Sequence, residues 1–295
     1  MNSKSSSFFA SIGLVLTAAI WGFAFVVVKD SLDYIGSVYM VAIRFTIAAL
    51  GLGIIFCKRL KKLDKKHLIM GAVTGFFLFA GYVVQTIGCF YTTAGKNAFL
   101  TTIYVILIPL ISWPLYKKRP GWYVWVAAIM SVTGIGLLAL GNEDIAGMNR
   151  GDVLTLICGL FYALHILWTE KCNKAGCDTM LITFLQFLFS AVYGWILAPF
   201  MDGAFPIHAI QNPRIIVSML YLGLLSSMLC FSLQNIGLKY VQSSLASLFL
   251  SFESVFGVLF STLFLHEQIT SRMGTGCVLI FLAVVLAETK FKFRK

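Results

Sequence analysis

The sequence predicts an all-α polytopic membrane protein with ten transmembrane helices in two inverted five-helix repeats. Of the 295 residues, 59% are hydrophobic and only 12% are charged, and the mean hydropathy is +0.88. An average soluble domain has about 25% charged residues, so a soluble fold would lack half of its usual charged surface. The other two observations that predict this fold are ten long apolar segments and a set of residues that recurs at one constant separation.

Each spanning helix should contain about 20 apolar residues, because the hydrocarbon core of a bilayer is about 30 Å thick. Ten segments meet this requirement, at about 8–28, 36–57, 67–90, 95–116, 121–141, 152–170, 179–200, 214–234, 243–265 and 272–289. They do not alternate between apolar and polar residues as the strands of a membrane β-barrel do. The first segment lacks a small-residue cleavage site, so we interpret it as an uncleaved helix rather than a signal peptide.

Basic residues distinguish the two sides of the membrane. Most of the 23 Lys and Arg residues lie in one set of alternate loops, with clusters at 58–66, 117–119 and 290–295. The opposite loops contain five, which are Lys29, Lys96, Arg150, Arg214 and Arg272. The positive-inside rule therefore predicts a multi-pass protein of the plasma membrane with both termini in the cytoplasm. The net charge of +11 then reflects topology and anionic lipid headgroups, and we expect no nucleic-acid partner.

The second half of the chain repeats residues of the first half at a constant separation. Gln85, Gly88, Tyr91, Ala94, Ala98 and Thr102 are matched by Gln234, Gly237, Tyr240, Ser243, Ser247 and Ser251. The last three matches put small residues at every fourth position, which lets helix backbones approach closely in lipid. We divide the chain into repeats at 1–145 and 146–295. Because each repeat has five spans, the second enters the membrane from the opposite side, as in secondary transporters with a substrate site near the midplane.

Glu253 lies near the middle of the ninth predicted span. A charged residue in the membrane interior costs at least about 2.5 kcal/mol, so such a residue usually faces a polar cavity or a polar partner. Two interpretations remain open. We favour a contact with a substrate ammonium group or a protonation site. The alternative is a protonated carboxyl that hydrogen-bonds a backbone carbonyl and holds two helices together.

His165 lies in the sixth span on a polar stripe with Cys158, Tyr162 and Thr169 at helical spacing. Because imidazole titrates near neutrality, His165 could take part in proton coupling. We favour a neutral ring that is hydrogen-bonded to a Tyr or to the backbone, and in either case His165 can line a cavity.

Further cavity candidates are polar or aromatic side chains deep in other spans. Gln85 and Gln234 are matched by the repeat and either bind substrate or bridge helices. Tyr82 lies one turn from Gln85, and Trp21 could stack on a substrate or simply pack. The complete set of predicted substrate-binding residues is Trp21, Tyr82, Gln85, Tyr104, Tyr162, His165, Gln234 and Glu253.

The other charged side chains near the spans are given structural roles. Arg44 lies about 10 Å inside the second span, close enough for its long side chain to reach the interface. We favour an ion pair of Arg44 with Asp30 or Asp33 over a carboxylate-binding role. Four residues at helix ends are expected at the membrane interface, and these are Lys29, Lys96, His266 and Glu267. Gly71 and Gly75 form a GxxxG motif, which usually marks a packing face.

Several short motifs resemble those of the drug/metabolite transporter superfamily, specifically its ten-helix EamA-type members. They are Trp21-Gly22, Arg44-Phe45, the segment YVILIP at 104–109, and the ninth span from Ser247-Leu248 through Glu253 to His266-Glu267. The resemblance covers nearly the whole chain and implies alternating-access transport of small metabolites, often export of amino acids. Members usually carry Pro directly after the intramembrane Glu. Ser254 stands there in this chain, which removes the usual reason for a helix break at Glu253.

We therefore expect a secondary transporter that moves an amino acid or a related amphipathic solute across the membrane, with export as the expected direction. The alternatives are efflux of a drug or another metabolite and, from another class, a membrane-embedded enzyme. An enzyme is disfavoured because the sequence has no P-loop, GxGxxG or HExxH motif and only Glu253 is acidic at depth. Cys172 and Cys177 lack the partners of a zinc site, so we expect no metal and no cofactor. The expected partners are a small-molecule substrate and the lipid bilayer, and a homodimer is left open.

Overall fold

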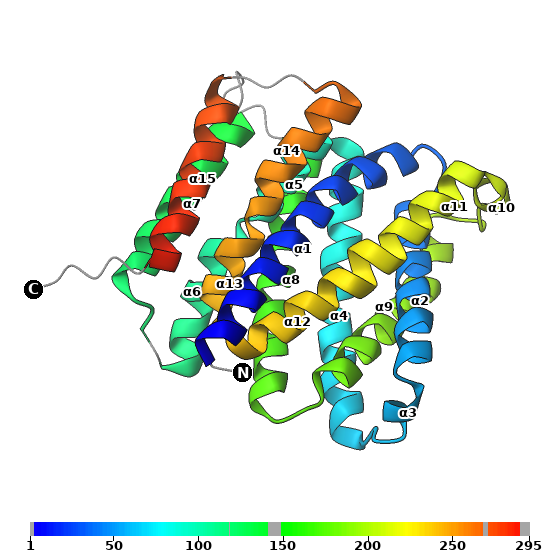
Figure 1. The fold of residues 1–295 in the computed structure, drawn as a ribbon. Coiled ribbons are helices and arrows are strands. Elements are labelled where there is room, and N and C mark those ends of the chain that lie inside the picture. The colour runs from blue at the N-terminus through cyan, green and yellow to red at the C-terminus, as the bar shows by residue number, and fades with distance from the viewer. Residues whose placement is uncertain (1–2, 118, 141–148, 268–270, 290–295) are drawn as a thin grey trace, which may run out of the picture.

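The computed structural model describes residues 3–117, 119–140, 149–267 and 271–289, which form helices and turns with no β-strand (Figure 1). The predicted boundary between residues 145 and 146, Lys118 and the basic tail at 290–295 lie outside the described residues. The helices are α1 (Ser3–Ser31), α2 (Ser37–Ile55), α3 (Cys57–Leu60), α4 (Lys65–Tyr91), α5 (Ala94–Thr101), α6 (Tyr104–Tyr116), α7 (Trp122–Leu140), α8 (Arg150–Lys174), α9 (Thr179–Met201), α10 (Ile207–Gln211), α11 (Pro213–Leu220), a π-helical segment (Tyr221–Leu229), α12 (Cys230–Tyr240), α13 (Ser243–Leu250), α14 (Phe252–Leu265) and α15 (Ser271–Thr289).

Eight helical segments of the described chain are long and apolar enough to cross a membrane. They are α1, α2, α4, α5 with α6, α8, α9, α11 through α12, and α13 with α14. The fifth and tenth predicted spans correspond to α7 and α15, which have shorter apolar stretches at Trp122–Gly134 and Gly274–Ala283. These two helices lie side by side at one edge of the bundle, and α2 and α9 lie at the opposite edge (Figure 1). The all-α membrane fold is confirmed, and eight of the ten predicted spans meet the length criterion.

Polarity is distributed as expected for a protein surrounded by lipid. Large apolar side chains cover the outside, among them Ile54 and Phe200, which are 75% and 84% exposed. Charged and polar side chains such as Arg44, His165 and Glu253 are buried inside. An extended exposed apolar surface of this kind marks a membrane contact. Polar and ionisable side chains that fall within the spans are therefore kept inside the bundle.

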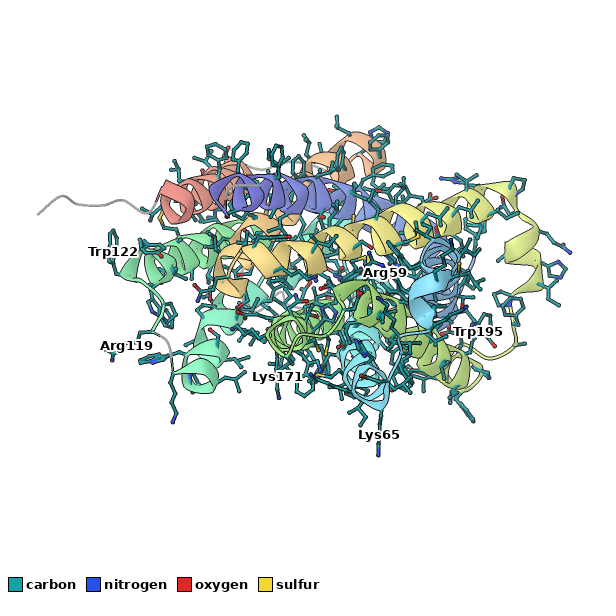
Figure 2. All side chains as sticks on the ribbon, turned by 60° about the horizontal axis from the view of Figure 1, so that its bottom comes forward. Arg59, Lys65, Arg119, Trp122, Lys171 and Trp195 are labelled. Atoms are coloured by element: carbon teal, nitrogen blue, oxygen red, sulfur yellow. The ribbon has the colours of Figure 1, made fainter. Side chains whose placement is uncertain are left out.

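Basic side chains gather at one end of the bundle, where α1 begins. Arg59, Lys65, Arg119 and Lys171 project from the ends of α3, α4, α6 and α8 that face this way (Figure 2). We call it the basic end, and the opposite end, with Lys29 and Lys96, the outer end. These names follow the predicted topology.

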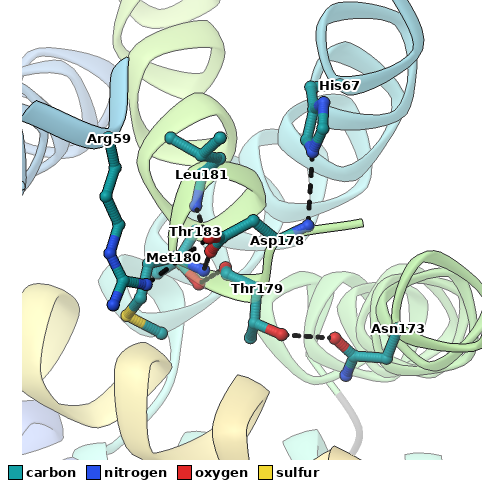
Figure 3. Close-up of polar contacts among 8 residues, drawn as sticks. All are labelled: Arg59, His67, Asn173, Asp178, Thr179, Met180, Leu181 and Thr183. Atoms are coloured by element: carbon teal, nitrogen blue, oxygen red, sulfur yellow. Dashed lines mark hydrogen bonds and ion pairs between the residues drawn. The ribbon is translucent and has the colours of Figure 1, made fainter. Parts of the chain in front are cut away.

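Short polar residues cap the helices where they begin. The Asp64 carboxylate accepts a hydrogen bond from the backbone N–H of His67 at 2.8 Å, and this bond lowers the pKa of Asp64 below its usual 3.8. Asn149 and Asp152 form a reciprocal capping box at α8. Asp178 caps α9 through the N–H groups of Met180 and Leu181 and lies near the Arg59 guanidinium, as Figure 3 shows.

Two spans are interrupted at equivalent places in the two repeats. The fourth changes from α5 to α6 at Thr102–Ile103, and the ninth changes from α13 to α14 at Ser251. At both breaks a hydroxyl donates to the carbonyl three residues earlier: Thr102 to Phe99 at 2.8 Å and Ser254 to Ser251 at 2.7 Å. Such bonds compete with the regular helix ladder and tighten the turn. The ninth span is therefore interrupted next to Glu253 although Ser254 stands where the family usually has Pro.

Glycines bring the central helices into close contact. Gly71 and Gly75 of α4 lie directly against Leu185 and Gln186 of α9, so the GxxxG motif is a packing face as predicted. Gly257 of α14 packs against Ala98 of α5 in the same way, which leaves no room for a larger side chain. These contacts fix the helices that surround a central cavity.

Candidate substrate cavity

A cavity lined by side chains from both halves of the chain lies between them. Its wall is mostly apolar with a few polar groups, as is usual for small-molecule sites. All eight side chains predicted from the sequence line it: Trp21, Tyr82, Gln85, Tyr104, Tyr162, His165, Gln234 and Glu253. Lining residues that the sequence did not single out include Arg44, Asn97, Ser226 and Phe231. Substrate binding by these residues stays a prediction.

Glu253 lies in the first turn of α14, directly after the break in the ninth span, and is 4% exposed. The Tyr104 hydroxyl donates a hydrogen bond to its Oε1 at 3.0 Å. The two residues are 149 positions apart, the separation of the sequence repeat, so they occupy equivalent places in the two halves. The partner of this carboxyl is thus a phenol of the other repeat and not the backbone carbonyl of the structural alternative. Within the described chain no basic side chain forms an ion pair with Glu253.

The Gln85 amide is fully engaged by neighbouring helices. The Tyr162 hydroxyl donates to Oε1 at 2.8 Å, and Nε2 donates to Thr101 Oγ1 at 3.0 Å. The backbone carbonyl of Gln85 accepts a bond from Asn97, whose Nδ2 also donates to Thr155 Oγ1. Gln85 therefore bridges α4, α5 and α8, which favours the helix-bridging alternative for this residue.

Gln234, its counterpart in the second repeat, is much less engaged. Its Nε2 is 3.4 Å from Asn235 Oδ1, which is a weak contact, and its carbonyl oxygen accepts no hydrogen bond from the described residues. Gln234 is 1% exposed and lines the cavity. Gln234 therefore has spare hydrogen-bonding capacity at the cavity wall, unlike Gln85.

His165 hydrogen-bonds a side chain that the sequence did not suggest. Its Nε2 lies 3.1 Å from Oε1 of Gln186 on α9, and that oxygen also accepts a bond from Asn235. The predicted partner, a Tyr or the backbone, is therefore wrong, because α9 packs beside α8 at this depth. Because the amide oxygen can only accept, Nε2 is the donor in this contact. Phe231 packs on the ring with centroids 5.6 Å apart.

Aromatic rings form much of the cavity wall. The Trp21 indole donates to the backbone carbonyl of Ser226 at 2.7 Å, and its ring lies 5.0 Å from that of Phe231. Tyr82 contacts Tyr162 and Phe231 edge-on, with centroids 5.5 and 5.9 Å apart. The indole N–H of Trp21 is thus held by the protein, and its ring contributes apolar surface to the cavity wall.

Arg44 differs from its prediction. Asp30 forms its ion pair with Arg214, and Asp33 is exposed, so neither neutralises Arg44. The side chain points inward instead, is 2% exposed, and lines the cavity. The reason is that Ser226 and Ser227 of the π-helical segment offer hydroxyl acceptors inside the bundle. Arg44 could have been identified as a cavity residue by the criterion used for Glu253, because both are ionisable residues within a span.

Residues expected at the membrane interface tie helices together at the outer end. Lys29 Nζ donates to the last carbonyls of α4, at 2.8 Å from Cys89 O and 2.7 Å from Thr92 O. Lys96 pairs with the buried Asp152 at 2.9 Å. The Glu267 carboxylate accepts from the first N–H groups of α5, and His266 ends α14 in a left-handed conformation. These four residues lie at helix ends, as the sequence predicts. The structure adds the groups on neighbouring helices that Lys29, Lys96 and Glu267 bind.

Comparison with known proteins identifies the family. The model of the EamA-like transporter family matches the chain twice, over residues 8–140 and 149–289. The chain belongs to this family. Its two copies lie on either side of the segment in which we predict the repeat boundary.

Several known proteins match nearly the whole chain. An "Uncharacterized transporter" of Archaeoglobus fulgidus is 35% identical over 288 residues, covering 96% of this chain and 86% of its own length. The "Uncharacterized transporter YoaV" of Bacillus subtilis is 25% identical over 291 residues, covering 96% and 98%. A solved structure titled "Crystal structure of protein" superposes with a TM-score of 0.74 at 16% identity, covering 95% and 96%, and so shares the fold.

This EamA-like protein is thus a multi-pass membrane transporter and not an enzyme. The resemblance that the sequence motifs indicated is confirmed by the two family matches.

Proposed function

We propose that this protein is a secondary transporter that carries an amino acid or a related small amphipathic solute across the plasma membrane by alternating access. Both termini lie in the cytoplasm, and the direction is export. The observation that carries the proposal is the Glu253 carboxyl, buried in mid-span beside the cavity with Tyr104 as its hydrogen-bond donor. A carboxylate accepts several hydrogen bonds, so a substrate ammonium group can be added to this arrangement.

The cavity wall supports an amphipathic solute. Rings of Trp21, Tyr82 and Phe231 offer apolar contact, and the Gln234 amide offers polar groups that the protein leaves free. The site lies where two inverted repeats meet, next to interrupted helices, which is where secondary transporters bind their substrates. An inorganic ion would need a denser set of oxygen ligands than this wall supports.

Uptake of labelled amino acids into proteoliposomes tests the proposal. We expect saturable flux of at least one amino acid, and we expect Glu253→Gln to lower that flux about tenfold or more, since it removes a charge that contacts the ammonium group. Asp33→Asn, at an exposed acidic residue away from the cavity, is the matched control and should transport normally. Size-exclusion profiles of the purified variants check folding.

Other outcomes have definite meanings. Full flux in Glu253→Gln would keep the transporter and remove Glu253 from the substrate path. Flux only of lipophilic drugs or other metabolites, and of no amino acid, would replace the proposed substrate class.

Coupling to protons is tested in the same vesicles. Without a nucleotide site in its sequence, the protein moves solute down a gradient or by coupling to an ion, and Glu253 and His165 are the candidate proton carriers. The pH dependence of flux should change in Glu253→Gln or in His165→Ala. If it changed in neither variant, the coupling role would be abandoned.

A further inference from the structure

We propose that Arg44 binds the carboxylate of the substrate, so that the solutes carried in the proposed function must have a carboxylate group. The inference deepens the proposed function and rests on it. It starts from the position of Arg44 on α2, where the side chain is almost fully buried and lines the same cavity as Glu253.

Arg44 has only neutral partners. Its Nε donates to Ser227 Oγ at 3.1 Å, and its Nη2 donates to Ser226 Oγ at 2.9 Å. Its guanidinium carbon lies 4.4 Å from the centre of the Tyr82 ring and 5.8 Å from that of Phe45. Hydroxyl groups and ring faces solvate a cation in part, but they do not neutralise it. Because a guanidinium does not lose its proton in a protein, the charge persists.

The acidic residues of the described chain are engaged elsewhere or lie away from Arg44. The carboxylates that have a hydrogen-bond or ion-pair partner are Asp30 with Arg214, Asp64 with His67, Asp152 with Lys96, Glu170 with Lys174, Asp178 with Arg59, Asp202 with the N–H groups of Val38 and Tyr39, Glu253 with Tyr104, and Glu267 with the N–H groups of Ala94 and Gly95. Across the described ranges, none forms an ion pair with Arg44. A buried charge without a counter-charge is costly, which makes an anionic ligand a strong partner.

The two serines also orient the guanidinium. They lie next to each other in the π-helical segment Tyr221–Leu229, where the wide turn sets consecutive side chains closer in angle than the about 100° of an α-helix. Ser227 occupies Nε and Ser226 takes one hydrogen of Nη2. Within the described chain Nη1 makes no hydrogen bond. The edge formed by Nη1 and Nη2 is therefore left for a bidentate carboxylate, the geometry that an Arg fork matches.

Arg44 and Glu253 thus place opposite charges on one cavity wall without pairing with each other. If the two charges were within contact distance, they would neutralise each other and leave nothing for a solute. Together they offer a guanidinium for the carboxylate and a carboxyl group for the ammonium group of a zwitterion. An amine without a carboxylate would satisfy Glu253 and leave Arg44 uncompensated.

The test compares three ligands on three proteins. The ligands are the amino acid with the largest flux, its carboxamide, which lacks the carboxylate, and its N-acetyl derivative, which lacks the ammonium group. Competition against labelled uptake is measured for wild type, Arg44→Gln and Glu253→Gln. We expect wild type to prefer the free amino acid to the carboxamide about tenfold or more, and Arg44→Gln to reduce this ratio to about one. Arg44→Gln should still discriminate against the N-acetyl derivative. Glu253→Gln should lose this discrimination and should still prefer the free amino acid to the carboxamide.

Arg44→Lys keeps the positive charge but lacks the planar guanidinium fork. It should recover part of the preference for the free amino acid over the carboxamide. If Arg44→Gln fails to fold, the Ser226→Ala/Ser227→Ala variant replaces it, because it keeps the guanidinium and removes its orientation; its carboxamide ratio should then fall. An unchanged ratio in the variant that folds, with or without a loss of flux, would overturn the proposal and leave a structural role.

Thermal unfolding in detergent distinguishes this failure from failure of the proposed function. Leucine, leucinamide, N-acetylleucine and isovalerate are added to the purified protein, since a ligand that binds only the folded state raises the midpoint. Stabilisation by leucine and isovalerate that Arg44→Gln loses, with no amino-acid flux in wild-type vesicles, would keep the carboxylate site and reject amino-acid transport. Amino-acid flux in wild type, with no Arg44-dependent stabilisation by leucine, N-acetylleucine or isovalerate, would keep amino-acid transport and reject the carboxylate site.

Discussion

The α4–α5 junction at the outer end and the α12–α13 junction at the basic end occupy equivalent positions in the two repeats, but different chemistry holds each in place. At the outer end, Lys96 pairs with the fully buried Asp152, whose other oxygen accepts a bond from Thr92 at 2.7 Å. Lys29 adds bonds to the last carbonyls of α4. An ion pair thus holds this junction, and its Asp152 carboxylate has no contact with water because it is fully buried.

At the basic end, the counterparts of Thr92, Lys96 and Asn97 are Val241, Leu245 and Ala246. Val241 and Ala246 are buried, and within the described chain the α12–α13 junction contains no ion pair. Apolar side chains can exchange one apolar contact for another, or for contact with lipid, at little cost in free energy. The two charges of an ion pair must instead be pulled apart, which costs more free energy. The comparison teaches that two junctions at equivalent places in the repeats are held by different chemistry, an ion pair at the outer end and apolar packing at the basic end.

Removing the buried carboxylate should have the largest effect. Asp152→Asn keeps the size of the side chain and an oxygen for Thr92, but it leaves Lys96 charged and mostly buried. Breaking one partner of a buried pair costs about 3–5 kcal/mol, so the midpoint of unfolding in detergent should fall clearly. Arg59→Gln breaks the exposed pair with Asp178 and should cost less than about 1 kcal/mol. Equal decreases in the unfolding midpoint of the two variants would show that the Lys96–Asp152 pair contributes no more to stability than the exposed pair.

A matched pair of glycine substitutions tests packing at the same two junctions. A Cβ on Gly88 would lie 2.7 Å from Thr155 Oγ1 and 3.0 Å from the Gly151 backbone oxygen, so Gly88→Ala should cost about 1–3 kcal/mol of unfolding free energy. A Cβ on Gly237 would meet only the flexible Leu14 side chain at 3.2 Å, so Gly237→Ala should change stability by less than about 1 kcal/mol. A larger loss in Gly237→Ala would reverse the order of the two junctions.

An exposed carboxylate provides the smallest expected effect. Asp64 at the basic end has a pKa lowered from 3.8 by the His67 N–H, so its stabilisation is present above about pH 4 and is lost as the pH falls through the lowered pKa. Asp64→Asn keeps a capping oxygen without a charge. The difference in unfolding midpoint between wild type and Asp64→Asn should therefore shrink between about pH 6 and about pH 3. A difference that grew on acidification would contradict the sign of the shift, and Asp64→Ala, which lacks the cap, should be less stable at both pH values.

Much of the fold and the content of the cavity were predictable from the sequence. Runs of apolar residues set the spans, since the thickness of the bilayer fixes their length. Ionisable and amide side chains within those runs are expensive unless they face a polar interior, which is why Glu253, His165, Gln85 and Gln234 could be assigned to one cavity. Their shared lining of the cavity follows from this cost, and their role in binding is still to be measured.

The partners of these side chains could not be predicted in the same way. Arg44 turns inward because Ser226 and Ser227 lie opposite it in the folded bundle, and nothing within the second span contains that information. His165 finds Gln186 for the same reason. The helix break before Glu253 could not be decided from Ser254 alone, because hydroxyl groups at Ser247, Ser251 and Ser254 each donate to the carbonyl three residues earlier in the folded span. Tertiary neighbours, rather than periodicity, decide these details.

The contact between Tyr104 and Glu253 has a consequence for how such a protein can arise. Two separate, identical five-helix subunits in opposite orientations would bring the same residue face to face at this point, either two phenols or two carboxyls. Two carboxylates at hydrogen-bond distance repel each other, and two phenols offer no acid group to a solute. A mixed pair requires two halves whose sequences differ at this position, as the two repeats of this chain do. Divergence of the halves is therefore what allows this site to hold one acid and its donor.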